Sequence, residues 1–125
     1  MKSEIERIAD YPKIPISDGT KIIYVAGAYR AKTEEQKREN VWHATRVSVR
    51  LWELGWIVFS PINNSAYFDV YSSLPDEVWL KGSLKFLEFC QAIFMLSNWL
   101  ESTGAKRELE RAVEMGLSVY YEDRL

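Results

Sequence analysis

The residues best suited to chemistry stand near the end of the chain, in the run Ser102-Thr103-Gly104-Ala105-Lys106-Arg107-Glu108. This run follows the apolar stretch 92–96 and opens an amphipathic segment that ends at Gly116. The pattern predicts a strand, a short polar loop and a helix with a carboxylate near its start. A helix N-terminus favours anions, because it offers unpaired N–H groups and the positive end of the helix dipole. Glu108 is therefore either a nucleophile at the mouth of a sheet or an ordinary helix-start charge, and spacing alone leaves both interpretations open.

A second polar motif, Gly27-Ala28-Tyr29-Arg30, directly follows the apolar run 22–26. Gly27 permits close backbone approach, Tyr29 supplies an aromatic face and a hydroxyl, and Arg30 can grip an anion with two nitrogens. The motif matches neither the three-glycine dinucleotide pattern nor a P-loop. Alone, it fits a tight turn with an exposed arginine equally well.

Other common chemistries find no support in the sequence. His43 is the sole histidine and Cys90 the sole cysteine, and no set of ligands is spaced for a metal. We therefore expect no metal or organic cofactor, and we expect His43 at the surface or in helix packing. The chain has no Gly-x-Ser-x-Gly nucleophile elbow. The apolar run 92–96 is followed by Ser97 and Asn98, so the acidic phospho-acceptor of a receiver domain is missing.

Short apolar runs alternate with amphipathic segments along the chain. The runs predict strands at 22–26, 56–59, 92–96 and 117–121. Three- and four-residue spacing predicts helices from Thr33 to Gly55, from 77 or 78 to 89, and from about 105 to 115. The helix positions expected to be buried are Val41, Ala44, Val47, Leu51, Leu54, Leu80, Leu84, Leu87, Leu109, Ala112 and Val113. The alternation predicts a single α/β domain of flavodoxin or Rossmann type, with an open parallel sheet of four to five strands and helices on both faces.

Ligands of such sheets bind beyond the carboxyl ends of the strands, where the strand order reverses. We expect three loops to meet there, at 27–30, 60–64 and 98–108. Residues 62–77 show no period, and a loop of this length is usually functional or mobile. We assign residues 1–20 to an N-terminal extension, with a short helix at 4–9 capped by Ser3, and residues 21–125 to the α/β domain.

Composition fits one small globular domain: 125 residues, 47% hydrophobic and 27% charged. The net charge of −2 and the mixed charges argue against a nucleic-acid partner. No apolar run has membrane-spanning length, and the N-terminus lacks a signal-peptide core. The lone Cys90 fits a reducing compartment, so we expect a cytoplasmic protein. Aromatic residues make up 14% of the chain, which favours a homo-oligomer.

The order of these pieces resembles the nucleoside 2-deoxyribosyltransferase-like superfamily over residues 22–121. The resemblance consists of Gly-Ala-Tyr-Arg after the first strand, then Gly-x-x-Val-Phe-Ser-Pro, then Asn-Trp-x-x-Ser-x-Gly-Ala-x-x-Glu after an apolar strand. It looks closest to a small phage and bacterial branch, and it extends to the deoxynucleoside 5′-monophosphate N-glycosidases.

The resemblance implies that Glu108, four residues after Gly104, attacks the anomeric carbon of a (deoxy)ribosyl group and displaces the base. A carboxylate beside this carbon stabilises and captures an oxocarbenium-like transition state. A second base can then accept the sugar, or water can hydrolyse the intermediate. The expected ligand is thus a small nucleoside or nucleotide.

Two positions resemble those of the enzymes that act on nucleotides. Six residues before the nucleophile these hydrolases tend to have a phosphate-binding Ser, here Ser102, where the nucleoside enzymes tend to have Asp. Arg30 matches an arginine that the same hydrolases use for phosphate. By the same resemblance, Gly27, Tyr29, Ser102 and Gly104 would hold sugar and phosphate. The candidates for contacting the base are Asn63, Asn64, Tyr67 and Trp99, of which Trp99 fits packing or an oligomer contact equally well.

One departure from the family pattern concerns the proton for the leaving base. Ser83 and Gln91 stand where the family usually has two Asp residues, and losing a general acid typically costs ~10²–10⁴ in rate. Asp69, Asp76 and Glu77 are candidates to replace them. A slow enzyme and a non-catalytic nucleotide-binding module for sensing or defence both fit this departure, and a structural subunit is a third alternative.

Overall fold

The computed structural model describes residues 14–122, which form a four-stranded, entirely parallel open sheet. The strand order is β2-β1-β3-β4, so β2 and β4 form the two edges. The strands are β1 (Ile22–Ala26), β2 (Ile57–Phe59), β3 (Ala92–Met95) and β4 (Ser118–Tyr121). This arrangement confirms the predicted α/β fold.

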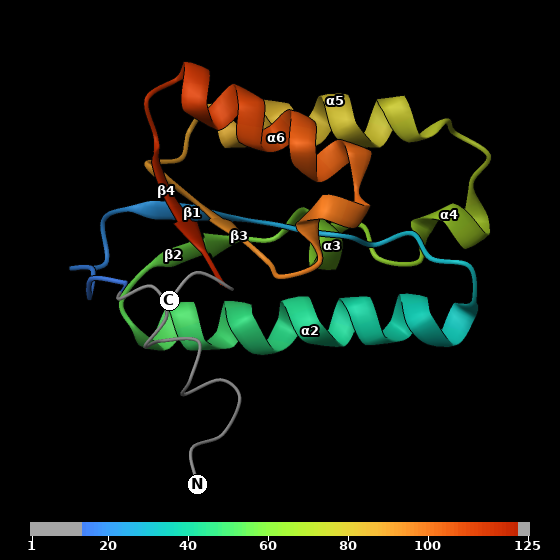
Figure 1. The fold of residues 1–125 in the computed structure, drawn as a ribbon, viewed down its shortest axis with the longest axis horizontal. Coiled ribbons are helices and arrows are strands. Elements are labelled where there is room, and N and C mark those ends of the chain that lie inside the picture. The colour runs from blue at the N-terminus through green and yellow to red at the C-terminus, as the bar shows by residue number, and fades with distance from the viewer. Residues whose placement is uncertain (1–13, 123–125) are drawn as a thin grey trace, which may run out of the picture.

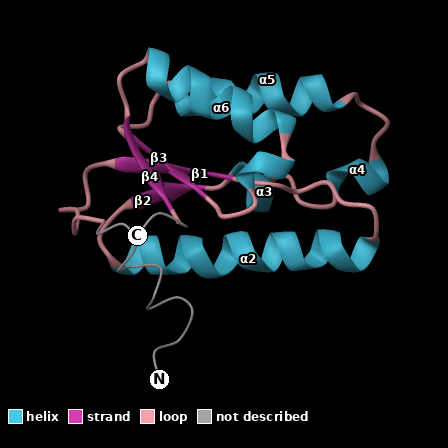
Figure 2. Ribbon diagram, viewed as in Figure 1, coloured by secondary structure: helices cyan, strands magenta, loops and turns pink. Residues whose placement is uncertain are grey.

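Helices cover both faces of the sheet, as predicted. Figure 1 shows α2 (Glu34–Glu53) along one face, and α5 (Asp76–Leu87) and α6 (Thr103–Glu114) along the other. The amino ends of these helices lie on the side where the strands end. Figure 2 shows the short helices α3 (Pro61–Asn64) and α4 (Phe68–Tyr71) on this side as well, and the 3₁₀ turn η1 (Trp99–Glu101) follows β3.

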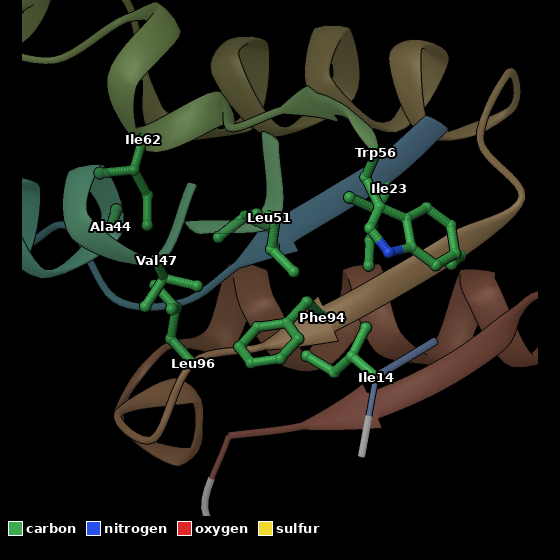
Figure 3. Packing of buried hydrophobic residues seen from close by; sticks show 11 residues of the cluster. Ile14, Ile23, Ala44, Val47, Leu51, Trp56, Ile62, Phe94 and Leu96 are labelled. Carbon is green, nitrogen blue, oxygen red and sulfur yellow. The ribbon is translucent and has the colours of Figure 1, made fainter. Parts of the chain in front are cut away.

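Alternate residues of the central strands point to opposite faces and build two cores. Ile23 and Val25 of β1 pack with Val47 and Leu51 of α2, and Figure 3 shows this cluster closing around Phe94. On the other face, buried residues of β1 and β3 pack against buried residues of α5 and α6. The strand residues are Tyr24, Ala26, Ile93 and Met95, and the helix residues are Leu87, Ala105 and Ala112. A sheet buried on both faces explains the continuous apolar runs of its strands.

The termini of α2 match their sequence signals. The Thr33 hydroxyl accepts a hydrogen bond from the Gln36 N–H at 3.0 Å, which caps the first turn. At the other end Gly55 has φ +92°, a backbone conformation that residues other than glycine disfavour. Helix α2 therefore ends where the sequence predicted.

Several expectations differ from the structure. The helix predicted to reach residue 89 ends at Leu87, and Glu88 is its cap. Residues 62–77 are not one irregular loop, because α3 overlaps the start of this region, α4 lies within it and α5 begins at Asp76. Four-residue helices are too short to show a period. Helix α6 begins at Thr103 rather than near 105, because Ser102 is its cap. Val113 is 62% exposed, so its predicted burial is wrong: the buried stripe of α6 runs through Ala105, Glu108 and Ala112, and Val113 is turned away from it.

The described part of the N-terminal extension packs on the domain. Ile14 is buried in the core beside α2, and the Trp56 indole N–H donates to the Pro15 carbonyl at 3.0 Å. The short helix predicted at 4–9 lies outside the described residues. Across residues 14–122, no helix combines the length and apolar character needed to cross a membrane.

Candidate functional site

A pocket of about 470 Å³ opens beyond the carboxyl ends of β1 and β3. The chain leaves these two strands toward opposite faces of the sheet, which makes this the topological switch point. Residues from all three predicted loops line the pocket: 27–30, Pro61 and Ile62, and 101–104. Its volume lies within the range of small-molecule sites.

Gly27 lets the ends of β1 and β3 approach each other closely. A Cβ atom at Gly27 would lie 2.6 Å from Cδ1 of Leu96 and 2.8 Å from Oδ1 of Asn98. The same Asn98 oxygen accepts a hydrogen bond from the Ala28 N–H at 3.0 Å. The buried Asn40 donates to the Tyr29 carbonyl at 3.2 Å. Gly27 is therefore needed for packing, and two asparagines hold the loop that presents Tyr29 to the pocket.

Glu108 forms the floor of the pocket. It lies in the second turn of α6 and is 5% exposed, and it accepts a hydrogen bond from the hydroxyl of the fully buried Tyr24. Burial raises the pKa of Glu108 to about 7, and the hydrogen bond from Tyr24 opposes this rise. The pKa of Tyr24 is raised well above its usual value by burial and by the charge of Glu108. The floor thus carries a carboxyl group that titrates near neutral pH.

The start of α6 forms one wall. The Ser102 hydroxyl accepts from the Ala105 N–H at 3.0 Å and so caps the helix. The N–H groups of Thr103 and Gly104 belong to the first turn, where a helix supplies them no partner. A Cβ atom at Gly104 would lie 3.7 Å from Cδ1 of Leu80 and from the Ser102 hydroxyl oxygen, which is ordinary van der Waals contact, so packing at the Cβ position does not require this glycine.

An ion-pair network forms the opposite rim, which we call the Asp69 cluster (Tyr29, Arg30, Lys37, Asp69 and Asp76). Asp69 accepts from the Tyr29 hydroxyl at 2.5 Å, from Nη1 of Arg30 at 3.0 Å and from Nζ of Lys37 at 3.0 Å. These donors, Tyr29 first, lower the pKa of Asp69. Nη2 of Arg30 meets Asp76 at 2.5 Å. The cluster ties α4 to the loop after β1.

Carboxyl groups outnumber cations in the pocket lining. The charged residues that line it are Arg30 and Arg107, and Asp69, Asp76, Glu77, Glu101 and Glu108. Nη1 of Arg107 lies 3.7 Å from Oε1 of Glu77. The remaining wall is largely apolar and includes Ile62, Trp79 and Leu80. The Trp79 ring meets Phe68 edge-on, with centroids 6.1 Å apart.

The structure places six of the seven predicted site residues in the pocket lining: Gly27, Tyr29, Arg30, Ser102, Gly104 and Glu108. Asn63 is the exception, because its side chain bonds the hydroxyls of Ser60, at 2.7 Å, and Thr45, at 2.8 Å.

The other base-contact candidates also lie outside the lining. Trp99 packs against Tyr121, with centroids 5.9 Å apart, and Tyr67 meets Tyr29 edge-on at 6.3 Å. Asn64 is exposed and does not line the pocket.

The two positions that depart from the family pattern, Ser83 and Gln91, lie apart, and only Ser83 is near the candidates for supplying a proton. Ser83, Asp69, Asp76 and Glu77 line the pocket. Gln91 lies at the opposite, amino end of the central strands, just before β3, where its side-chain oxygen accepts from the Ile22 N–H at 2.8 Å.

Sequence reasoning missed the residues that position the site. The buried stripe of α2 begins with Lys37 and Asn40, two polar residues in line with Ala44. Polar residues on a buried helix face require partners, so this signal was present in the sequence. Tyr24 gave a second signal, because a tyrosine in a central strand needs a partner for its hydroxyl.

Two further titratable residues lie apart from the pocket. Nε2 of His43, which belongs to α2, meets both carboxylate oxygens of Glu122, the residue after β4, at 2.9 Å. Cys90 is buried, which raises the pKa of its thiol to about 11. Between residues 14 and 122, no group of His, Cys, Asp and Glu side chains is arranged to hold a metal ion.

Fold and site together define a small doubly wound α/β domain with an acidic pocket at its switch point and a buried carboxyl group on the pocket floor. Residues 21–123 match the family described as domain of unknown function DUF1937, and the chain belongs to this family. Comparison with curated proteins gives no match.

Proposed function

We propose that this domain cleaves or transfers the N-glycosidic bond of a (deoxy)nucleoside or its 5′-monophosphate, with Glu108 as the nucleophile. The observation that carries the proposal is the buried carboxyl group of Glu108, held by Tyr24 on the floor of a pocket large enough for such a ligand. A charged residue near a helix start that has no function is expected to face solvent, because it then avoids the cost of desolvation.

The reaction divides into two displacements at the anomeric carbon. A Glu108 oxygen bonds to C1′ while the bond from C1′ to the base nitrogen breaks, and the base leaves with the bonding electrons and takes up a proton. Water or a second base then attacks C1′, loses a proton and releases the Glu108 carboxylate. Hydrolysis and transfer thus share their first step.

The environment of Glu108 supports this role. Only the ionised form is nucleophilic, and burial raises its pKa to about 7, so both forms are populated near neutral pH. The hydrogen bond from Tyr24 orients one oxygen and favours the ionised form. Burial leaves the carboxylate poorly solvated, which strengthens its attraction to positive charge developing at C1′.

The remaining lining residues supply binding groups. Ser102 and the backbone of Gly27 and Gly104 offer hydrogen-bonding groups for a sugar. The Tyr29 hydroxyl is already bonded to Asp69 and to the Tyr67 N–H, so Tyr29 offers mainly its ring, and Trp79 offers an aromatic wall for a base. Asp69 is a poor proton donor, because three donors hold it ionised. With Ser83 in place of an acid, we expect slow turnover.

We also propose that the protein is cytoplasmic and forms a homo-oligomer. A single buried cysteine suits a reducing compartment. Large aromatic side chains stand exposed on α2 and after α5, with Trp42 61%, Trp52 52% and Phe89 72% exposed. Such side chains are enriched at protein interfaces.

The test incubates the protein with each deoxynucleoside and 5′-monophosphate, with and without a free acceptor base, and follows released or exchanged base by chromatography. We expect product from the native protein and a loss of more than roughly 10³-fold in Glu108→Ala. Glu110→Gln is the matched control, because it alters an exposed carboxylate of the same helix outside the pocket. Saturable binding without product would favour a nucleotide-binding module instead, and neither binding nor product would overturn both.

A further inference from the structure

We propose that the pocket selects an uncharged nucleoside over its 5′-monophosphate, because carboxylates already neutralise both guanidinium groups that line it. This inference rests on the proposed function and narrows its substrate class. It runs against the expectation from the resemblance that Arg30 and Ser102 bind phosphate, because the charges of the pocket lining favour the nucleoside.

Arg30 is the natural candidate for gripping a phosphate, yet both of its terminal nitrogens are engaged. Nη1 lies 3.0 Å from Asp69 and Nη2 lies 2.5 Å from Asp76. Asp69 cannot easily give way, because Tyr29 and Lys37 bond to it as well and its side chain is only 13% exposed. A phosphate at Arg30 would therefore sit beside an ionised carboxylate that stays in place.

The other cations near the pocket offer no replacement. Arg107 faces Glu77, with 3.7 Å between Nη1 and Oε1. Lys37 is 7% exposed and bonds to Glu34 and Asp69, each at 3.0 Å. Even without Glu108, whose two forms are both populated near neutral pH, four carboxyl groups stand against two guanidinium groups in the lining, so a phosphate would enter a region of net negative charge.

The start of α6 is the remaining source of positive potential, and it is too weak to reverse this balance. A helix N-terminus carries about half an elementary charge, whereas a phosphate monoester carries about −1.5 to −2 at pH 7. The Ser102 hydroxyl, which already accepts from Ala105, has a proton left to donate in one neutral hydrogen bond. A sugar hydroxyl would use that bond equally well.

The same carboxylates suit a ligand that ends in hydroxyl groups. Asp76, Glu77 and Glu101 are exposed at the pocket rim, and ionised carboxylates act only as hydrogen-bond acceptors. A free 5′-hydroxyl is a donor, and a phosphate in the same place is not. The rim therefore favours binding of the 5′-hydroxyl and disfavours binding of the phosphate.

The experiment measures Kd by calorimetry, and kcat/KM by base release, for each of the four common deoxynucleosides and its 5′-monophosphate. We expect the nucleoside to be favoured by more than about tenfold, because like charges placed together at a binding site are strongly unfavourable. The preference should shrink as salt is added, since salt screens the repulsion at the exposed rim.

Asp76→Asn tests the cause of the preference. Asp76 is 70% exposed, so its amide variant is expected to fold normally, and the change frees one nitrogen of Arg30 from its anionic partner. We expect the monophosphate to gain about fivefold on the nucleoside in this variant. Glu110→Gln removes the same charge elsewhere on the surface and should leave the ratio unchanged.

The outcomes separate the inference from the proposed function. Base release with a preference for monophosphates would overturn the inference and leave the proposed function standing. A nucleoside preference that Asp76→Asn does not weaken would also overturn it, because the selection would then have another origin. Neither binding nor release with any compound would overturn the proposed function and the inference with it.

Discussion

The pocket holds two carboxyl groups in opposite situations, Glu108 on the floor and Asp69 on the rim. Glu108 is buried with a single donor, Tyr24, and its pKa is raised to about 7. Asp69 has three donors, two of them cations, and its pKa is lowered. Desolvation dominates at the first site and hydrogen bonding at the second. Two carboxyl groups whose pKa values are pushed apart suit different tasks: one can change its charge near neutral pH, and the other holds a fixed charge.

The largest expected effect is the pH dependence that Glu108 gives to the protein's unfolding free energy. The folded pKa of Glu108 is about 7 and its unperturbed value is 4.5. Its stabilising contribution is thus fully present below about pH 4.5 and is lost as the pH rises through 7. The difference corresponds to about 3 kcal/mol. Relative to Glu108→Gln, the native protein should lose about this much unfolding free energy between roughly pH 4 and pH 8, measured by urea denaturation. A constant difference between the two proteins across this range would refute the assignment.

The rim should respond in the opposite direction. Asp69 has a lowered pKa, so its contribution is present above the unperturbed value of 3.8 and disappears as the pH falls through the lower folded value. Asp69→Asn should cost about 1–3 kcal/mol of unfolding free energy at neutral pH, because Lys37 loses a buried partner. The cost should vanish in acid. Glu110→Gln serves as the control, and an equal cost at every pH would show that charge has no part in it.

A smaller effect links Glu108 to the buried tyrosine that donates a hydrogen bond to it. Tyr24→Phe removes the donor that lowers the pKa of Glu108. The midpoint of the pH dependence of base release should therefore rise above that of the native protein by up to about one pH unit, since a hydrogen bond of this kind contributes about 1 kcal/mol. Tyr120→Phe removes a hydroxyl from a strand tyrosine outside the pocket and should leave the midpoint in place. An unchanged midpoint in Tyr24→Phe would disconnect Tyr24 from the titration.

The smallest effect marks the boundary of the pocket. The Asn63 side chain bonds Ser60 and Thr45 and does not line the cavity. Asn63→Ala should change kcat/KM for base release by less than about twofold, as expected of a surface position. A loss of tenfold or more would mean that the region around α3 rearranges when the ligand binds.

The sequence predicted the architecture because its signals are local. Continuous apolar runs defined the strands, Thr33 and Gly55 defined the ends of α2, and parallel topology required the segments after β1 and β3 to meet. The proximity of Glu108 to Tyr29 in one pocket follows from that topology. The least accurate region, 62–77, is the one where helices of four residues give no repeating pattern.

The polar partnerships of the site could not be predicted in the same way. Tyr24 and Glu108 are 84 residues apart, and Tyr29 and Asp69 are 40 apart. Which carboxylate meets which donor depends on how the helices and the loop before α5 are placed against the sheet. The sequence therefore predicted Arg30 as an anion-binding residue, but it did not show that Arg30 forms ion pairs with Asp69 and Asp76.

The shortness of the outer strands has a consequence for self-association. β2 has three residues and is followed closely by Pro61, and β4 has four. Each edge strand therefore exposes few unpaired backbone groups, and proline supplies no N–H to continue the hydrogen-bond ladder beyond β2. A second copy that paired with either edge strand would therefore form few backbone hydrogen bonds. The fold is thus poorly suited to fibre growth by strand addition, and copies that associate are left with their helical surfaces for contact.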